Sequence, residues 1–200
     1  MITYKKLAWT ECSPIEFVRR WETAAQGPAA RLYDEHPGTK NLTRRHLTRL
    51  YGLWQNRSRL GISDRRNIAR LAPALPSINS FRGLGRPKEA EVLDAYEMLT
   101  RTVGRRFSLK LFALHVALPR IFPPFSASRL AAYHFLACSR PGNTSPFTEA
   151  LLPTYFEYQQ FFFDLVTAAV ADPSRVDKTL LALGHCLDVY YPKIRIRPSV

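Results

Sequence analysis

The spacing of apolar residues is the feature that most constrains how this chain can fold. In most segments between its glycines and prolines, apolar residues recur every three or four positions, which is the period of an amphipathic helix. The segment from Ser13 to Gly27 is typical: Ser13 can cap a helix, Pro14 fits the first helical position, and Glu16 completes a capping box. Alternation typical of a strand is confined to the short tail Lys193–Arg197. We therefore expect an all-α protein.

The length of the chain limits how many cores it can bury. Two hundred residues usually form a single core, so we expect one all-α domain over residues 1–190, followed by a basic, disordered tail at 191–200. Glycines, prolines and capping residues, Ser63 among them, separate the expected helices, and residues 72–86 are expected to be irregular. The expected helices cover residues 13–27, 41–55, 63–71, 87–103, 108–118, 126–139, 147–171 and 173–189, and those at 108–118 and 126–139 are expected to form a hairpin.

The positive charge of the chain is concentrated in one stretch. The chain carries a net charge of +13 and has a sequence pI near 10.1. Residues 40–70, called the basic segment below, hold nine basic residues and the single acid Asp64, a net charge of +8. Residues 111–190 are almost neutral, with five basic and six acidic residues. Such a local excess predicts a polyanionic partner, with nucleic acid as the leading expectation.

Eight of the nine basic residues in this segment are arginines, whose planar guanidinium can donate two hydrogen bonds to one phosphate. If six to ten phosphate contacts formed, affinity would fall by roughly 10³ to 10⁵ between about 50 and 200 mM salt. The alternative is an ordinary solvated helix surface. A membrane surface is a weaker alternative, because the apolar face of this segment is expected to be core. The expected nucleic-acid contacts in the segment are Arg44, Arg45, Arg49, Arg57, Arg59, Arg65 and Arg66.

One part of the sequence resembles a known family. The run from Gly104 to Tyr133 has a glycine, an apolar helix, a proline and a Phe-Pro-Pro motif, in the order found in the helix-hairpin-helix superfamily of DNA glycosylase-like proteins. The resemblance implies a hairpin whose backbone amides approach a phosphate. It adds Arg105, Arg106 and Lys110 to the expected nucleic-acid contacts. Ser126 stands where those enzymes carry a catalytic Asp, so we expect DNA binding without glycosylase chemistry.

A looser resemblance covers about residues 41–190. Four motifs are similar to those of an uncharacterised family of bacterial proteins: a Trp-x-Asn turn, an apolar helix ending in His-x-x-x-Pro, the Phe-Pro motif, and a final Asp-Lys-x-Leu helix followed by a glycine. In this chain they are Trp54–Asn56, His115–Pro119, Phe122–Pro124, and Asp177–Leu180 with Gly184. This resemblance implies a shared fold and no particular activity.

The remaining chemistry-bearing residues give weaker signals. Ser126 with His134 could be imagined as a nucleophile and its base, but no Gly-x-Ser-x-Gly motif surrounds Ser126, and a capping serine is the simpler interpretation. The aromatic run at 155–163 is expected to be core rather than a platform for stacked bases. The histidines and cysteines are too scattered for a metal site or a disulfide framework, so we expect no metal, no cofactor and buried structural thiols: His36, His46, His115, His134, His185, Cys12, Cys138 and Cys186.

These observations leave three functional hypotheses. The first is a cytoplasmic helical protein that binds DNA rather than RNA through its arginines and lies on no membrane. The second is a divergent enzyme that processes a DNA base near Ser126. The third is an interaction module whose arginines dock an acidic protein. No signal peptide or membrane-spanning segment is apparent in the sequence.

Overall fold

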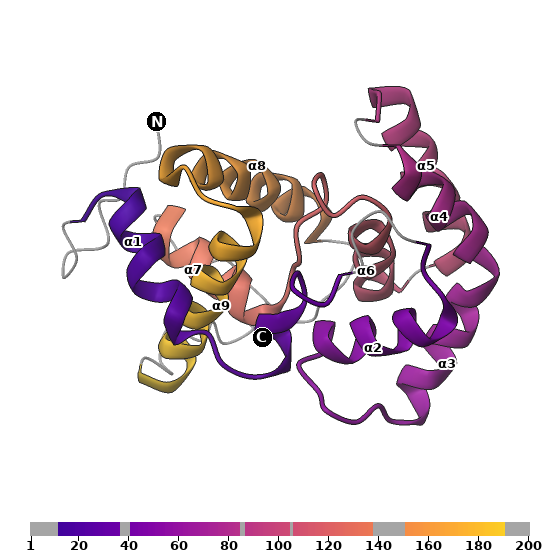
Figure 1. The fold of residues 1–200 in the computed structure, drawn as a ribbon, viewed down its shortest axis with the longest axis horizontal. Coiled ribbons are helices and arrows are strands. Elements are labelled where there is room, and N and C mark those ends of the chain that lie inside the picture. Colours follow the sequence, from indigo (N-terminus) through magenta and orange to yellow (C-terminus); the bar gives the residue numbers. More distant parts are fainter. Residues whose placement is uncertain (1–11, 37–40, 85–86, 105, 138–150, 191–200) are drawn as a thin grey trace, which may run out of the picture. The chain divides into compact units, whose positions relative to one another are not determined.

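The structure is a computed structural model that describes residues 12–36, 41–84, 87–104, 106–137 and 151–190 (Figure 1). All regular secondary structure in these ranges is helical, which confirms the expected all-α class. The chain divides into two compact units: unit 1 combines residues 1–26 with 125–200, and unit 2 is formed by residues 27–124. The single domain expected from the length stays a prediction. None of the helices in the described ranges is long and apolar enough to cross a membrane.

Unit 1 is built around the last helix of the chain. Helix α9 (Pro173–Tyr190) packs against α1 (Pro14–Trp21), α7 (Ala127–Ala137) and α8 (Leu152–Ala169). Helix α1 begins with the predicted capping box, in which Ser13 and Glu16 exchange backbone and side-chain hydrogen bonds. The helices α7 and α9 approach closely at Gly184, where a Cβ atom would lie only 2.0 Å from the carbonyl oxygen of Ser128.

The described interior of unit 1 contains several aromatic side chains and a buried ion pair. Tyr155, Tyr158 and Phe162 are fully buried, and the ring of Phe125 lies 5.2 Å from that of Tyr155 and 5.1 Å from that of Tyr158. This burial confirms the core prediction for these three side chains, whereas the prediction is wrong for Phe156 of the same run, which is 44% exposed. The guanidinium of Arg129 donates to both carboxylate oxygens of Asp177, at 2.6 and 2.7 Å, and each of these two side chains is only 2% exposed.

Unit 2 surrounds the helix α6 (Phe107–Ala117), in which every residue but Ser108 is buried. Helices α4 (Leu75–Gly83) and α5 (Glu89–Val103) pack on α6. The rings of Tyr51 and Trp54, from α2 (Arg44–Trp54), meet Phe112 of α6 at 5.0 and 5.6 Å. Helix α3 (Ile62–Leu71) packs on α2 and α5. The basic segment thus forms two helices with their apolar faces in the core, as its periodicity predicts.

The turn after α2 ties this helix to a distant part of unit 2. Asn56 adopts a left-handed conformation, with φ of 53°, which ends the helix. Its side-chain oxygen accepts a hydrogen bond of 3.1 Å from the backbone amide of Ala29, in the 3₁₀ helix η2 (Pro28–Arg31). Gly27 lies against the same side chain, with a φ of +85° that favours glycine. The Trp-x-Asn motif therefore fixes the position of η2 beside the end of α2.

Some expectations about the helices are wrong. Residues 72–86 were expected to be irregular, yet they include the 3₁₀ helix η3 (Ala72–Ala74) and α4, because Pro73 and Pro76 occupy first-turn positions, where the missing N–H is not needed. Ser63 does not cap α3: the cap is Gly61, whose amide donates to the carboxylate of Asp64 at 2.9 Å. The hairpin expected from residues 108–118 and 126–139 is not confirmed, because α6 and α7 lie in different units. The tail at 191–200 lies outside the described residues.

Candidate nucleic-acid interface

A pocket of about 660 Å³ opens in unit 2, where four parts of the chain meet. We call it the arginine pocket, because its rim carries five arginines: Arg31, Arg44, Arg49, Arg57 and Arg65. They come from η2, from two turns of α2, from the turn after α2 and from α3. The floor is mainly apolar, with Leu53 and Ile68 almost fully buried and Leu60 half-buried. The fold thus brings together arginines that are up to 34 positions apart in the sequence.

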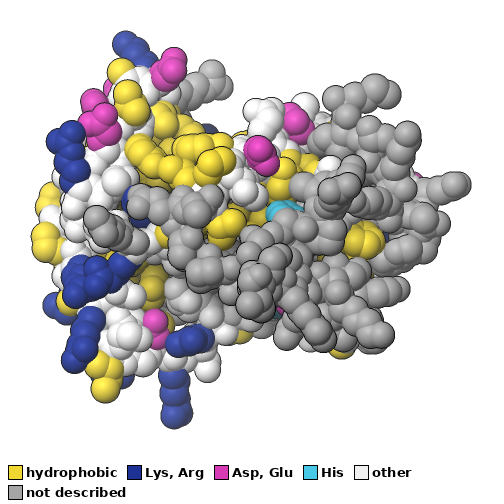
Figure 2. Space-filling model, turned by 180° about the vertical axis from the view of Figure 1, so that it is seen from behind, with side chains coloured by type: hydrophobic (Ala, Val, Ile, Leu, Met, Phe, Trp, Pro, Cys, Tyr) yellow, Lys and Arg dark blue, Asp and Glu magenta, His cyan; other side chains and the backbone are white. Residues whose placement is uncertain are grey.

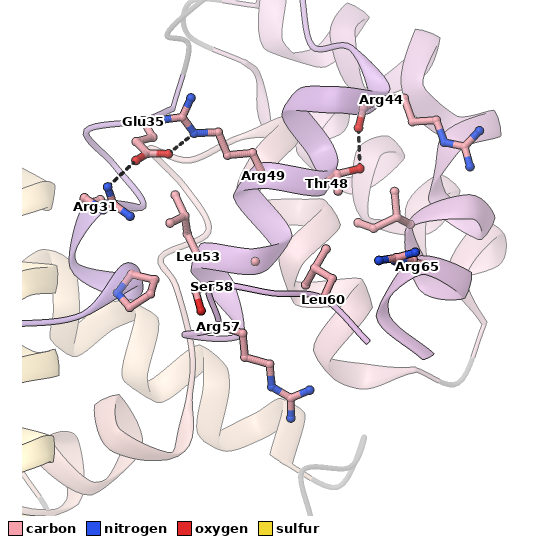
Figure 3. Close-up of a pocket in the computed structure, with 13 residues that line it drawn as sticks. Arg31, Glu35, Arg44, Thr48, Arg49, Leu53, Arg57, Ser58, Leu60 and Arg65 are labelled. Atoms are coloured by element: carbon pink, nitrogen blue, oxygen red, sulfur yellow. Dashed lines mark hydrogen bonds and ion pairs between the residues drawn. The ribbon is translucent and has the colours of Figure 1, made fainter. Parts of the chain in front are cut away.

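Among the described residues that line the arginine pocket, Glu35 is the one carboxylate. It forms ion pairs with Arg49 and, at 3.4 Å, with Arg31, and these three side chains meet on one wall of the pocket (Figure 3). The Glu35 side chain is 13% exposed, whereas Arg49 and Arg31 are 66% and 61% exposed. The hydrogen bond that Arg49 donates to Glu35, followed by the negative charge of Glu35, raises the pKa of the Arg49 guanidinium. Two of the five arginines are therefore partly neutralised.

Arg57 has a separate carboxylate partner outside the lining of the pocket. Its guanidinium lies 3.4 Å from Asp64, the buried acid at the start of α3. Its backbone amide donates to the carbonyl oxygen of Gly52 at 2.9 Å, which folds the turn back over α2. A Cβ atom at Gly52 would lie 3.3 Å from the carbonyl oxygen of Arg57, so a glycine allows this close approach. The tight turn holds Arg57 at the edge of the pocket.

The other arginines of the basic segment are exposed and form no ion pair with any described residue. Arg44 and Arg65 belong to the pocket, and the Arg65 side chain extends toward Leu60 (Figure 3). The remaining four are exposed on the same two helices and the turn between them: Arg45, Arg59, Arg66 and Arg70. In the space-filling view, Lys and Arg side chains gather along the edge of unit 2 on the left (Figure 2). These guanidinium groups remain available for a ligand.

Two of the three further residues expected to contact nucleic acid, Lys110 and Arg106, do not line this pocket. Lys110 lies in α6 and is 1% exposed, so its ammonium group does not reach the surface. Arg106 is exposed at the start of α6 and is not part of the pocket lining. Arg105 lies outside the described residues. The glycosylase-like resemblance suggested these three residues, whereas charge density suggested four of the five arginines that line the pocket.

Sequence reasoning missed Arg31 and Glu35. Both fall in residues 27–40, a stretch rich in glycine and proline that lies between two expected helices. Their spacing of four positions is the one local signal that could have paired them. Their place beside α2 depends on the bond between Asn56 and Ala29, which joins residues 27 positions apart. Local patterns do not reveal a contact of that kind.

Ser126, the weak candidate for a catalytic residue, lies in unit 1 and acts as a helix cap. Its hydroxyl oxygen accepts from the backbone amide of Arg129 at 3.4 Å and from the Arg129 guanidinium at 3.1 Å. His134 follows eight residues later on the same helix, which corresponds to a separation of about 12 Å along the axis. His134 is therefore too far along α7 to accept a proton from Ser126. This geometry gives the proposed pair no route to nucleophilic chemistry.

Unit 2 also holds a half-buried histidine, His36, beside a buried arginine, Arg82. The Arg82 guanidinium donates to the carbonyl oxygen of Val116 at 2.7 Å and lies 2.9 Å from the His36 Nε2 atom. Burial and the neighbouring Arg82 charge lower the pKa of His36 to about 4, and burial lowers the pKa of Arg82 to about 10. The ring of His115 lies 5.9 Å from that of His36, and its Nδ1 atom lies 2.8 Å from the carbonyl oxygen of Phe122. His36 is therefore neutral at pH 7.

The described residues include no cluster of His, Cys, Asp or Glu large enough to hold a metal ion. Cys12 and Cys186 are free thiols and are half-buried rather than buried, and Cys138 lies outside the described ranges. Comparison of the chain with protein-family models, with curated proteins and with solved structures finds no match. The chemistry of the arginine pocket is therefore the basis on which a function can be argued.

Proposed function

We propose that this protein binds nucleic acid, with the arginine pocket and the exposed arginines beside it as the binding surface. The observation that supports this most is that five arginines line one pocket, in which Glu35 is the one carboxylate among the described lining residues. An arginine that serves fold stability is usually paired with an acid, as Arg129 is with Asp177. Arg44 and Arg65 have no such partner among the described residues and are exposed where a phosphate could reach them.

The physical basis of binding is the match between guanidinium and phosphate. Each guanidinium can donate two parallel hydrogen bonds to phosphate oxygens, and every phosphate neutralised releases condensed counterions. Arg45, Arg59, Arg66 and Arg70 extend the positive surface beyond the pocket and can contact neighbouring phosphates of one strand. Contacts of this kind position a nucleic acid without selecting its sequence. We expect tight binding at low salt and weak sequence preference.

Binding of a fluorescent single-stranded or duplex DNA, and of the matching RNA, tests the proposal. Between about 50 and 200 mM salt we expect the affinity of the protein to fall steeply, with a log–log slope set by the number of phosphates contacted. Replacing Arg44 and Arg65 by Gln should reduce that slope by about two, because each lost phosphate contact lowers it by about one.

A variant in unit 1 provides the matched control. Arg19 and Arg20 are exposed on α1, so Arg19→Gln/Arg20→Gln removes the same charge far from the arginine pocket in the sequence. This control should keep the salt slope of the unmodified protein. Absence of binding at low salt, or equal losses in both double variants, would overturn the proposal. Capture of a single stoichiometric acidic protein with no nucleic acid bound would favour a protein-docking role instead.

A further inference from the structure

We infer that the arginine pocket receives the terminal phosphate of a nucleic-acid strand, an inference that rests on the proposed function and names the part of the ligand that the pocket recognises. The first argument is the arrangement of the charges. Arg31, Arg49 and Arg65 come from three different elements and surround one space, rather than following a line along one helix. A line of arginines follows the backbone of a strand, whereas a ring concentrates charge on one group that enters the space between them.

The charge of a strand end fits this ring better than the charge of a strand interior. A phosphodiester inside a strand carries one negative charge and is flanked by sugars on both sides. A terminal phosphomonoester carries about −1.5 to −2 charges at pH 7 and presents three strong acceptor oxygens. The pocket offers five guanidinium groups, of which three pair with Glu35 or Asp64 and two pair with no described acid. A terminal phosphate can therefore accept more hydrogen bonds from the guanidiniums of the pocket than a phosphodiester can.

The size and floor of the pocket fit one terminal nucleotide. A volume of about 660 Å³ lies within the range of small-molecule sites, which is roughly 300 to 1,000 Å³. Gly52, Leu53, Leu60 and Ile68 give the pocket an apolar floor on which the sugar or base of that nucleotide can pack. Arg45 and Arg66 are exposed on the two helices that line the pocket and can contact the phosphates that follow.

The experiment compares ends on one strand. A single-stranded DNA of about 12 nucleotides is prepared with a 5′-phosphate, with a 3′-phosphate or with hydroxyls at both ends, and the dissociation constant of each is measured at low salt. We expect one phosphorylated end to bind about 10-fold more tightly than the hydroxyl form, the ratio expected from at least one additional charge-assisted hydrogen bond. The preference should shrink as the pH falls through about 6, where the phosphomonoester takes up its second proton.

Variants assign that preference to the arginine pocket. The variant Arg44→Gln/Arg65→Gln should remove the preference for the phosphorylated end. The control Arg19→Gln/Arg20→Gln should keep it. Both variants should fold, because all four side chains are exposed. Equal binding of all three strands, or a preference that survives in the pocket variant, overturns this inference and leaves the proposed function standing. A free mononucleotide that competes as well as the phosphorylated strand overturns the assignment to a strand end. Failure of every strand to bind overturns the proposed function itself.

Discussion

Arg129 in unit 1 and Arg65 in unit 2 are the same residue type in opposite environments. The Arg129 side chain is 2% exposed and donates two hydrogen bonds to Asp177, at 2.6 and 2.7 Å. Arg65 is exposed on the rim of the arginine pocket and forms no ion pair with a described residue. A buried guanidinium must have its charge and donors satisfied by protein groups, whereas an exposed one is satisfied by water that a phosphate can replace.

This comparison shows why total charge is a poor guide to a binding surface. Unit 1 also has exposed arginines, yet Arg175 is held by Glu22 through hydrogen bonds of 2.5 and 2.9 Å. In unit 2 the pocket contains more arginines than carboxylates. The location of the partner acids, more than the number of arginines, separates the arginines that stabilise the fold from those available to a ligand.

The largest expected effect on stability comes from removing one member of the buried pair. Arg129→Met leaves the Asp177 carboxylate buried without its guanidinium, so the free energy of unfolding of unit 1 should fall by about 3 to 5 kcal/mol. Urea denaturation, with hydrogen exchange in α7 and α9 to identify unit 1, measures the change. The double variant Arg129→Met/Asp177→Leu should recover much of the loss, and Arg65→Met in unit 2 should cost less than about 0.5 kcal/mol. Equal costs for Arg129→Met and Arg65→Met would contradict the contrast.

The next prediction concerns how stability depends on pH. Unit 2 also buries an arginine, Arg82, but its neighbour is a histidine rather than an acid. His36 has a pKa of about 4 in the folded state, below its ordinary value of 6.5, so folding favours the neutral ring. The unfolded chain binds the proton more readily, so this stability is fully present above about pH 6.5 and is lost as the pH falls toward 4. The full loss corresponds to about 3 kcal/mol.

The measurement compares urea unfolding of the unmodified protein with that of His36→Gln at about pH 7 and pH 4.5. Subtracting the variant's change in the free energy of unfolding from that of the unmodified protein removes the contribution of carboxylates that titrate in both. We expect the unmodified protein to lose more stability than the variant on acidification. The loss should appear as faster hydrogen exchange of the amides of α4 and α6. Identical pH profiles would show that His36 does not carry this dependence.

The sequence predicted those parts of the fold that depend on neighbouring residues. The capping box of Ser13 and Glu16 and the two helices of the basic segment follow local rules, and the structure contains them. Helix α4 was missed because Pro73 and Pro76 were interpreted as breaks, although both occupy first turns. The arginine pocket could be predicted as a basic surface but not as a pocket, since its shape depends on long-range contacts such as that between Asn56 and Ala29.

Helix packing gives a third prediction, of intermediate size. At Gly184 of α9 a Cβ atom would lie 2.0 Å from the carbonyl oxygen of Ser128, so Gly184→Ala should force α7 and α9 apart and cost about 1 to 3 kcal/mol. Gly83→Ala in unit 2 is the matched control, because no atom lies within 4 Å of the added Cβ, and it should leave stability nearly unchanged. Thermal unfolding of both variants checks the prediction. A Gly184→Ala protein as stable as the control would mean that the two helices can separate without cost.

The smallest expected effect concerns the acid inside the arginine pocket. Glu35 pairs with Arg49 and Arg31, so Glu35→Gln should add one positive charge to the pocket and make both guanidiniums available to phosphate. We expect nucleic-acid affinity at low salt to rise about 3- to 10-fold, as one additional exposed ionic contact contributes on the order of 1 kcal/mol, and the gain to shrink near 200 mM salt.

Glu22→Gln in unit 1 is the matched control for Glu35→Gln. It removes the same charge from another arginine–glutamate pair, that of Glu22 with Arg175, outside the arginine pocket. An equal rise in affinity in both variants would show that nucleic acid responds to net charge rather than to the pocket. A fall in affinity for Glu35→Gln alone would mean that Glu35 orients Arg31 and Arg49 for the ligand. Only a rise confined to Glu35→Gln supports the contrast between arginines held by acids and arginines available to phosphate.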